Sequence, residues 1–339
     1  MSNGVTLDKR IQLIINLLIS LSVFAVILYL VGIDKIFSVL LKARWELLAL
    51  AIVAYILLNV VMSYRIKLVL ESIGDKIPLK RIIPSNLAGM LASDFTPARA
   101  GYFFTAFSIS SRENIGLEKT MLSIFGPQMF DFIIKVLSAG ILLLLILSQT
   151  GMSNIIVNAA LLVVFLSAIL FVSALVFHPP LLKRFEFFES FPFAPRVFAF
   201  LRKMHMHSDK VLALKEKIVA ITLFSWFIKG IEWYLLSQAI GIKFSGDIIH
   251  DILFIMVFQG AITIIQFLPI PTLAGAGASE AGFAGILAFF GVPLEVAVTF
   301  GFLSRLVMIV VDMLSISVIL DYLHTHSLEK SLEGISGVH

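Results

Sequence analysis

Nine charged residues stand within sequence that is otherwise apolar enough to cross a membrane. An ionisable side chain at membrane depth costs about 2.5–3.5 kcal/mol on insertion scales, so each needs a partner or a water-filled cavity. Four of the nine are cations and five are anions, and this near balance favours pairing inside the protein. The nine residues are Asp94, Arg99, Asp131, Lys135, Lys229, Glu232, Glu280, Arg305 and Asp312.

Two pairs of these residues are spaced to meet on one face of a helix. Asp131 and Lys135 are four residues apart, and Lys229 and Glu232 are three residues apart. Side chains at these spacings are neighbours on a helix surface. Either pair could therefore be a purely structural ion pair.

Three other residues have no oppositely charged neighbour at helical spacing, and they are the best candidates for binding a ligand. Arg99 and Arg305 suit a phosphate, because a guanidinium binds two oxygens and stays charged. Two arginines facing one cavity, near the N-terminal ends of broken helices, would form an anion site. Glu280 could hold Arg305 or act as a proton relay, and the sequence does not choose. Asp312 lies seven residues from Arg305, too far for direct contact, so both need partners elsewhere.

Two apolar stretches are interrupted by proline and glycine. The first, 82–110, contains Pro97 and Gly101 around Arg99, and the second is 269–291. Backbone groups freed at such breaks cannot face lipid and must be buried or line a wet cavity. We expect 82–110 to be a re-entrant pair of half-helices and 269–291 to be broken or re-entrant. The alternatives are an ordinary cytoplasmic loop for the first and close packing through small residues for the second.

The composition predicts that membrane helices position these residues. Of 339 residues, 59% are hydrophobic and 14% are charged, whereas a soluble domain carries about 25% charge. We predict an all-α polytopic membrane protein, one transmembrane domain over 1–339, with about 7–8 transmembrane helices plus one or two re-entrant segments. The segments long enough to span a bilayer are 11–31, 45–64, 120–147, 154–177, 218–240, 248–268 and 294–320.

Lysine and arginine are distributed unevenly between the connecting segments. They concentrate in 65–81 and in the basic loop 178–217, whereas 148–153 has none and 241–247 has one. The positive-inside rule places the two basic segments, and with them the N-terminus, in the cytoplasm. Residues 321–339 form a tail. The net charge of +4 then reflects topology in a plasma membrane, and we expect no nucleic-acid partner.

Two segments combine apolar and charged residues in ways that suit a membrane surface. In 33–44, Ile33, Ile36 and Phe37 share one helical face, opposite charged residues, and 181–203 mixes phenylalanine with lysine and arginine. Both patterns are typical of segments that lie against lipid headgroups. The alternative for each is an amphipathic helix that packs on the protein itself.

The chain resembles the lysylphosphatidylglycerol synthase transmembrane region family, also described as flippase-like or uncharacterised family 0104. The matching stretches are Asn86, TPARAG at 96–101, Asp131, LPIPTLAGAGASEAG at 268–282 and LSRL around Arg305. By motif order the resemblance covers nearly the whole chain and implies lipid translocation. Carried over residue by residue, the shared site is Arg99, Gly101, Asp131, Gly277, Glu280 and Arg305.

The chain departs from the family pattern at three places. Tyr102 stands where the family has glutamate, Gln128 stands where it often has arginine, and Thr272-Leu273 replaces a double glycine. These differences affect any mechanism that needs those charges, and they indicate a divergent branch of the family.

These observations predict a lipid translocase that moves a phosphate-bearing lipid, either a phospholipid or a polyprenyl-phosphate carrier, between leaflets. The alternatives are an integral-membrane lipid-modifying enzyme with Glu280 or Asp131 as general base, and a scaffold for a glycan-assembly enzyme. We expect no enzyme activity, cofactor or metal. The expected partners are membrane lipids, a second copy of the chain or a lipid-glycan biosynthesis enzyme. The predicted substrate-binding residues are Arg99, Arg305, Glu280, Asp131, Gly101, Gly277 and Asn86, supported by Asp94, Lys135, Lys229, Glu232 and Asp312.

Overall fold

Every regular element in the described part of the chain is a helix. The computed structural model describes residues 32–96, 99–150, 194–244, 246–267 and 278–322, with Tyr29, Lys183, Arg184 and His324. Within these residues, five helices are long and apolar enough to cross a membrane. They are Trp45–Ile73, Leu117–Gln149, Lys215–Ala239, Ile248–Gln266 and Leu294–Tyr322.

These five helices correspond to five of the seven predicted spans. The other two predicted spans, 11–31 and 154–177, lie outside the described residues. The structure confirms an all-α polytopic membrane protein, in which most of each spanning sequence is apolar because lipid replaces water as its solvent.

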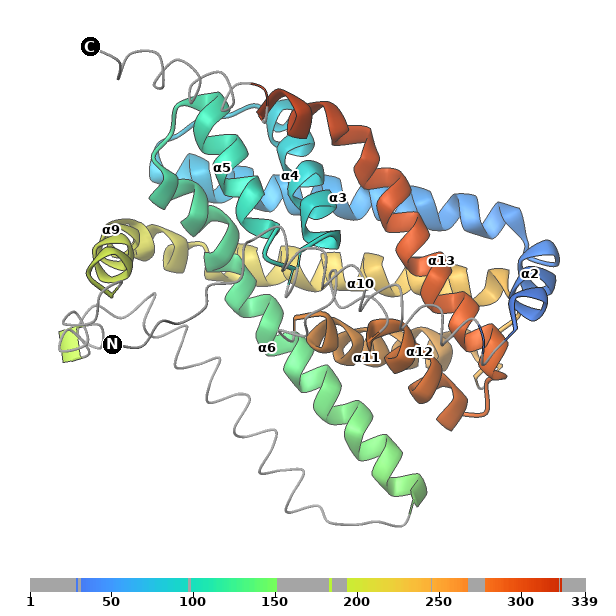
Figure 1. Cartoon of the computed structure of the whole chain (residues 1–339). Helices are drawn as coiled ribbons and strands as arrows, with labels where there is room; N and C mark the ends of the chain where they lie inside the picture. Colours follow the sequence, from blue (N-terminus) through green and yellow to red (C-terminus); the bar gives the residue numbers. More distant parts are fainter. Residues whose placement is uncertain are drawn as a thin grey trace, which may run out of the picture.

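Two long helices, α3 (Trp45–Ile73) and α10 (Lys215–Ala239), run side by side through the middle of the molecule (Figure 1). Three further helices pack around them: α6 (Leu117–Thr150), α11 (Ile248–Phe267) and α13 (Leu294–Asp312), which continues into the short 3-10 turn η4 (Met313–Ser315). The short apolar helix α12 (Ala278–Phe289) packs on α13 and α11.

An aromatic cluster joins four of these helices. Trp233 of α10, Phe258 of α11, Phe283 of α12 and Phe300 of α13 lie with ring centroids 5.1–6.3 Å apart. Phe300 contacts Trp233 and Phe283 edge to face, as Phe283 contacts Phe258, and the remaining pairs are tilted. Such contacts add to the stabilisation from burial. The cluster fixes the helices that carry the polar residues described below.

The first predicted break separates two short helices, α4 (Leu79–Asp94) and α5 (Tyr102–Glu113), which pack against each other. A Cβ on Gly89 would overlap Thr105, so the two backbones approach closely. At 1.5 Å per residue the helices are about 24 and 18 Å long, less than the hydrocarbon thickness of about 30 Å. The segment 82–110 therefore contains two helices and a break, and its re-entry into the membrane stays a prediction.

The predicted end of the second span is wrong. The span predicted to end at residue 64 continues to Ile73, because Ile66, Val69 and Leu70 repeat at helical spacing and are buried. Arg65, assigned above to a cytoplasmic segment, is consequently inside a helix with only 3% of its surface exposed.

The basic segment 178–217 is also not simply a loop. Residues 194–213 form helix α9 (Ala194–Ala213), which packs on α6 and α3. Val211 is fully buried and Leu201 packs beside it in a cluster with α3 and α6. This helix overlaps the stretch 181–203, for which an amphipathic helix that packs on the protein was the alternative above, and it buries one apolar face.

The opposite end of the bundle carries helix α2 (Ile33–Leu41) (Figure 1). Ile36 is buried against Ala284 and Val298, whereas Ile33 and Phe37 are exposed. Part of the predicted amphipathic face therefore packs on the protein, and part of it remains open.

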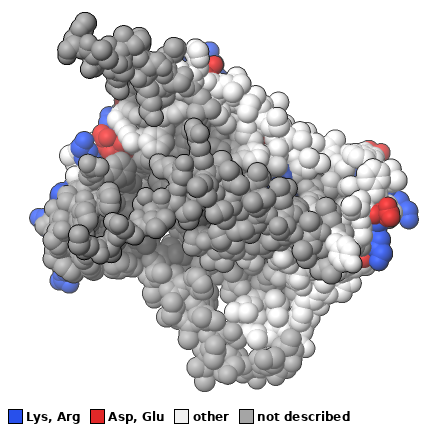
Figure 2. Space-filling view, viewed as in Figure 1, with Lys and Arg blue, Asp and Glu red and all other residues white. Residues whose placement is uncertain are grey.

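The described surface has an apolar belt between two charged ends. On the face drawn in Figure 2, charged side chains gather over α2 at one end and near α9 and α5 at the other, and the described residues visible between these ends are nearly all uncharged. Large exposed hydrophobic residues lie on the long helices, as at Leu50 and Leu57 of α3 and Leu144 of α6. This distribution suits helices whose middle portions contact lipid.

Candidate functional site

The break between α4 and α5 places Arg99 in an unusual backbone conformation. Its φ of +54° lies in the left-handed region, which costs a residue with a side chain about 1–2 kcal/mol. Thr96 closes the turn, because its Oγ1 accepts the Gly101 N–H at 2.6 Å and donates to the Ala92 carbonyl at 3.1 Å. A Cβ on Gly101 would overlap the backbone of Ala92 and Ser93, so glycine is required there.

The guanidinium of Arg99 is buried and only partly satisfied. Its Nη1 donates to Gln266 Oε1 at 2.8 Å, and its Nη2 lies 3.3 Å from both Ser93 Oγ and Asp94 Oδ1. Its Nε is buried and has no acceptor among the described residues. Arg99 is thus anchored by the backbone and by Asp94 while one charged donor stays unused.

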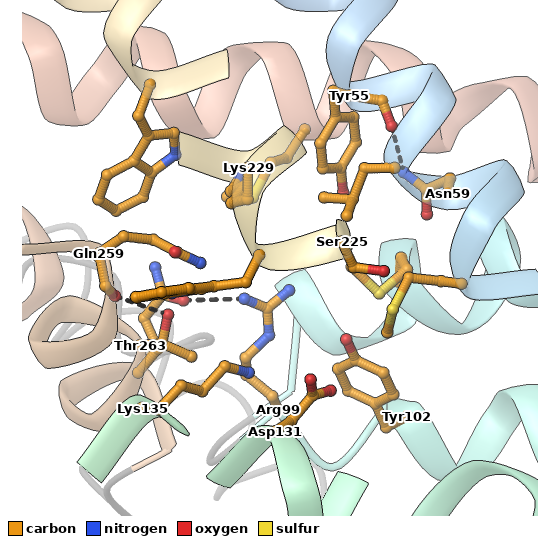
Figure 3. Close-up of a pocket in the computed structure, with 17 residues that line it drawn as sticks. Tyr55, Asn59, Arg99, Tyr102, Asp131, Lys135, Ser225, Lys229, Gln259 and Thr263 are labelled. Carbon is orange, nitrogen blue, oxygen red and sulfur yellow. Dashed lines mark hydrogen bonds between the residues drawn. The ribbon is translucent and has the colours of Figure 1, made fainter. Parts of the chain in front are cut away.

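Arg99 lines a cavity of about 100 Å³ at the centre of the bundle, with room for several waters or a small charged group. The labelled side chains of Arg99, Lys135 and Lys229 converge on it from three different elements (Figure 3). Tyr55 and Asn59 line it from the middle of α3, which is about 43 Å long. The cavity therefore lies deep within the spanning helices, far from either end.

The cavity combines positive charge with aromatic walls. Lys229 pairs with Glu232, Nζ to Oε2 2.7 Å, as its spacing predicted. Its Nζ also lies 4.8 Å from the ring centroid of Tyr55 and 5.5 Å from that of Trp233, so the ring faces stabilise the ammonium. Of the described lining residues, the cations are Arg99, Lys135 and Lys229, and the carboxylate is Asp131.

Two indole N–H groups add to the unused donors. The Nε1 atoms of Trp226 and Trp233 are buried, and no hydrogen-bond partner is recorded for them among the described residues. Both residues line the cavity with Arg99. A buried donor without an acceptor costs about 1–3 kcal/mol. Among its described lining residues, the cavity therefore contains unsatisfied donors beside one unsatisfied acceptor, Gln259 Oε1.

Asp131 pairs with a residue that the sequence analysis did not consider. Spacing suggested Lys135 as its partner, but the recorded ion pair is with Arg65 of α3, at 3.0 Å between Nη2 and Oδ2. Arg65 also donates to Thr222 Oγ1 of α10 at 2.8 Å. The buried apolar repeat after Arg65 was the one sequence signal that this residue belongs to the helix interior.

Arg305 and Glu280, predicted as binding residues, form a separate cluster. Arg305 Nε donates to Glu280 Oε1 at 2.6 Å, and its Nη2 donates to Ser279 Oγ at 2.8 Å. This contact joins the first turn of α12 to the middle of α13. The structure therefore does not bring Arg305 into the cavity beside Arg99, and its role in binding stays a prediction.

The remaining predicted residues are placed as follows. Asn86 donates to Asn59 Oδ1 at 3.3 Å and so orients an amide that lines the cavity. Asp312 accepts the Tyr55 hydroxyl at 3.0 Å. Gly277 lies outside the described residues.

A bundle of spanning helices around a buried, charged cavity defines a polytopic membrane protein, and comparison with known proteins agrees. A family model described as the lysylphosphatidylglycerol synthase TM region matches residues 13–315. The chain belongs to this family, which confirms the resemblance drawn from its motifs. Membership implies a membrane lipid-related role.

A curated relative gives a shorter match. The chain is 33% identical over 109 residues to the UPF0104 membrane protein MJ1595 of Methanocaldococcus jannaschii. The match covers 32% of this chain and 31% of that protein. It therefore spans about a third of the relative.

Proposed function

We propose that this protein moves a phosphate-bearing lipid between the two leaflets of the membrane. The headgroup phosphate occupies the central cavity while the hydrocarbon chains remain in the bilayer. The observation that carries this proposal is the Arg99 side chain, buried beside the central cavity of the bundle with a charged donor left unused. Phospholipids and polyprenyl phosphates share the phosphate ester that this chemistry recognises.

The cavity offers a phosphate both charge and hydrogen bonds. Arg99 Nε and the two indole N–H groups are buried donors without recorded acceptors among the described residues, and a phosphate has several acceptor oxygens. Hydrogen bonds between ionised partners are roughly twice as strong as neutral ones, and the low dielectric of the interior strengthens them further. The anion would thus recover the free energy that the unsatisfied donors now cost.

The break gives the site a means to move. Arg99 is held between two short helices, and the strain of its left-handed backbone is of the size stored at switch regions. Tilting of the α4–α5 pair against α3 and α10 would carry the guanidinium, and the phosphate it holds, along the bundle. Such gating of one bundle against another around a central site is common among transporters.

The surface charges support an orientation in the plasma membrane. The end that carries α9 and residues 76–81 is rich in lysine and arginine, and basic segments stay in the cytoplasm. We place that end and the N-terminus inside the cell.

Lipid movement in vesicles tests the proposal. Purified protein is reconstituted into liposomes that contain a fluorescent phospholipid, or in parallel a labelled polyprenyl phosphate, and outer-leaflet label is quenched chemically. We expect the wild type to expose inner-leaflet label and Arg99→Ala to slow this at least tenfold. Arg112→Ala is the matched control, because Arg112 lies on the same helix pair but is exposed.

The result would count against the proposal if folded Arg99→Ala moved both lipids as fast as the wild type. Folding of each variant is checked by thermal unfolding in detergent. Mass spectrometry of the same vesicles separates the enzyme alternative, because a lipid-modifying enzyme would generate a new lipid species.

A further inference from the structure

Asp312 of α13 is a buried carboxylate that no recorded ion pair neutralises. None of its surface is exposed. Its Oδ2 accepts the hydroxyl of Tyr55, and its Oδ1 has no hydrogen-bond partner among the described residues. A buried charge in this position is costly, and such a group lowers the cost by binding a proton. The geometry therefore favours a carboxyl that changes its protonation state.

The charged groups that face Asp312 come from each helix packed around it. They are Asp94 at the end of α4, Arg99 in the break and Lys229 on α10, together with the Tyr55 hydroxyl of α3. Arg99 and Lys229 each have a carboxylate partner already.

Helices α12 and α2 also pack on α13, and their charged groups are engaged or distant. Glu280 of α12 is held by Arg305 of α13 itself. Asp34 and Lys35 of α2 are exposed, and α2 packs near Val298, at the opposite end of α13. No cation on these elements therefore takes the place of a proton on Asp312.

The charge of the cavity gives this carboxyl a role. The ion pairs of Arg65, Arg99 and Lys229 are each neutral. Counted without regard to pairing, the described charged groups that line the cavity or contact its lining residues are four cations and, when Asp312 is ionised, four anions: Arg65, Arg99, Lys135 and Lys229, with Asp94, Asp131, Glu232 and Asp312. The whole group is neutral when Asp312 is ionised, so a bound phosphodiester would leave one net negative charge in a low-dielectric interior. One proton restores neutrality.

Tyr55 connects anion binding in the cavity with proton binding at Asp312, because it lines the cavity and also contacts Asp312. When Asp312 is ionised, the Tyr55 O–H donates to it. When Asp312 binds a proton taken from water, its own O–H can donate to the Tyr55 oxygen. The Tyr55 O–H is then free to rotate and donate to a guest in the cavity.

We propose that Asp312 is a proton-binding site, through which one proton is taken up with each phosphate anion that enters the cavity. This inference rests on the proposed function and adds an ion to it. A proton gradient would then bias the direction in which the lipid moves. Because one proton is linked to one anion, affinity for the anion falls about tenfold per pH unit once the carboxyl of the free protein is ionised.

Calorimetry measures the linkage. A short-chain phosphatidylglycerol is titrated into the full-length protein in detergent, in two buffers of different ionisation enthalpy, at several pH values. We expect the wild type to take up about one proton per bound probe in the alkaline range. Asp312→Asn should bind the probe with no proton uptake and an affinity independent of pH, because a neutral amide mimics the protonated state.

Two further variants keep the test decisive. Tyr55→Phe should weaken the linkage while leaving Asp312 in place, and Asp75→Asn, whose carboxylate pairs with Lys119 elsewhere, should behave as the wild type does. Binding without proton uptake by the wild type, or equal uptake by Asp312→Asn, overturns the proton site alone. No binding by the folded wild type overturns the proposed function and this inference with it.

Discussion

Two arginines of the helical bundle have opposite surroundings. Arg305 sits on a regular helix, and Glu280 and Ser279 take up its Nε and Nη2. Arg99 sits in a break with left-handed backbone, and its Nε has no acceptor among the described residues. Arg305 therefore links α13 to α12, whereas Arg99 has a donor that a ligand could bind.

The difference shows that intramembrane charge alone does not identify a binding residue. Both side chains are largely buried, which a charge in a membrane-spanning bundle requires. What separates them is whether a described acceptor binds the Nε donor, which is so for Arg305 and not for Arg99. A satisfied pair contributes to holding the fold, whereas an unused donor beside a cavity is available to a ligand.

The largest expected effect is on stability, at the ion pair between Arg305 and Glu280. Arg305→Ala leaves Glu280 buried without its cation, and breaking a buried pair costs about 3–5 kcal/mol. We expect a loss of this size in the free energy of unfolding, measured by denaturant titration in mixed micelles. Adding Glu280→Ala should recover part of the loss, and a loss below about 1 kcal/mol would mean that the pair does not hold α12 to α13.

The next effect concerns the backbone at the break. A methyl group at Gly101 would overlap Ala92 and Ser93, and overpacking of this kind costs about 1–3 kcal/mol. Gly101→Ala should therefore lower the midpoint of thermal unfolding. Gly285→Ala is the matched control, because nothing lies within 4 Å of the added atom, and an unfolding midpoint equally lowered in both variants would contradict the close approach.

The smallest effect sharpens the comparison between the two side chains. Arg99→Lys keeps the charge but loses the planar fork, so we expect affinity for a phosphate-bearing lipid to fall about tenfold, or 1.4 kcal/mol. Arg305→Lys should lower stability while leaving that affinity within about twofold. Lipid binding by native mass spectrometry distinguishes the two, and the reverse pattern would exchange the roles assigned here.

Local sequence patterns predicted much of the fold but little of the pairing. The lengths of the apolar segments located five described spans, and Pro97 with Gly101 marked the break. Both signals are read from one continuous stretch of sequence and do not depend on contacts between distant residues. The partners of other buried charges could not be predicted in this way, because they lie far away in the sequence. Arg99 contacts Gln266, 167 residues away, and Asp131 contacts Arg65, 66 residues away.

Short spacings predict only contacts within one helix. Lys229 and Glu232 meet as predicted because both lie on α10. The recorded ion-pair partner of Asp131 lies on α3. Arg65 was missed because a charge near the end of an apolar run is ordinarily assigned to a loop. Contacts between helices depend on packing, which no spacing in the sequence specifies.

The most direct test of the cavity as a lipid site is a density map of the protein in nanodiscs that contain anionic phospholipid. We expect a phosphate-sized feature within hydrogen-bond distance of Arg99 Nε, and none beside Arg305, in the wild type, with the feature lost in Arg99→Ala. A phosphate bound at Arg305, or a cavity that holds no lipid phosphate in saturating anionic lipid, would contradict the assignment.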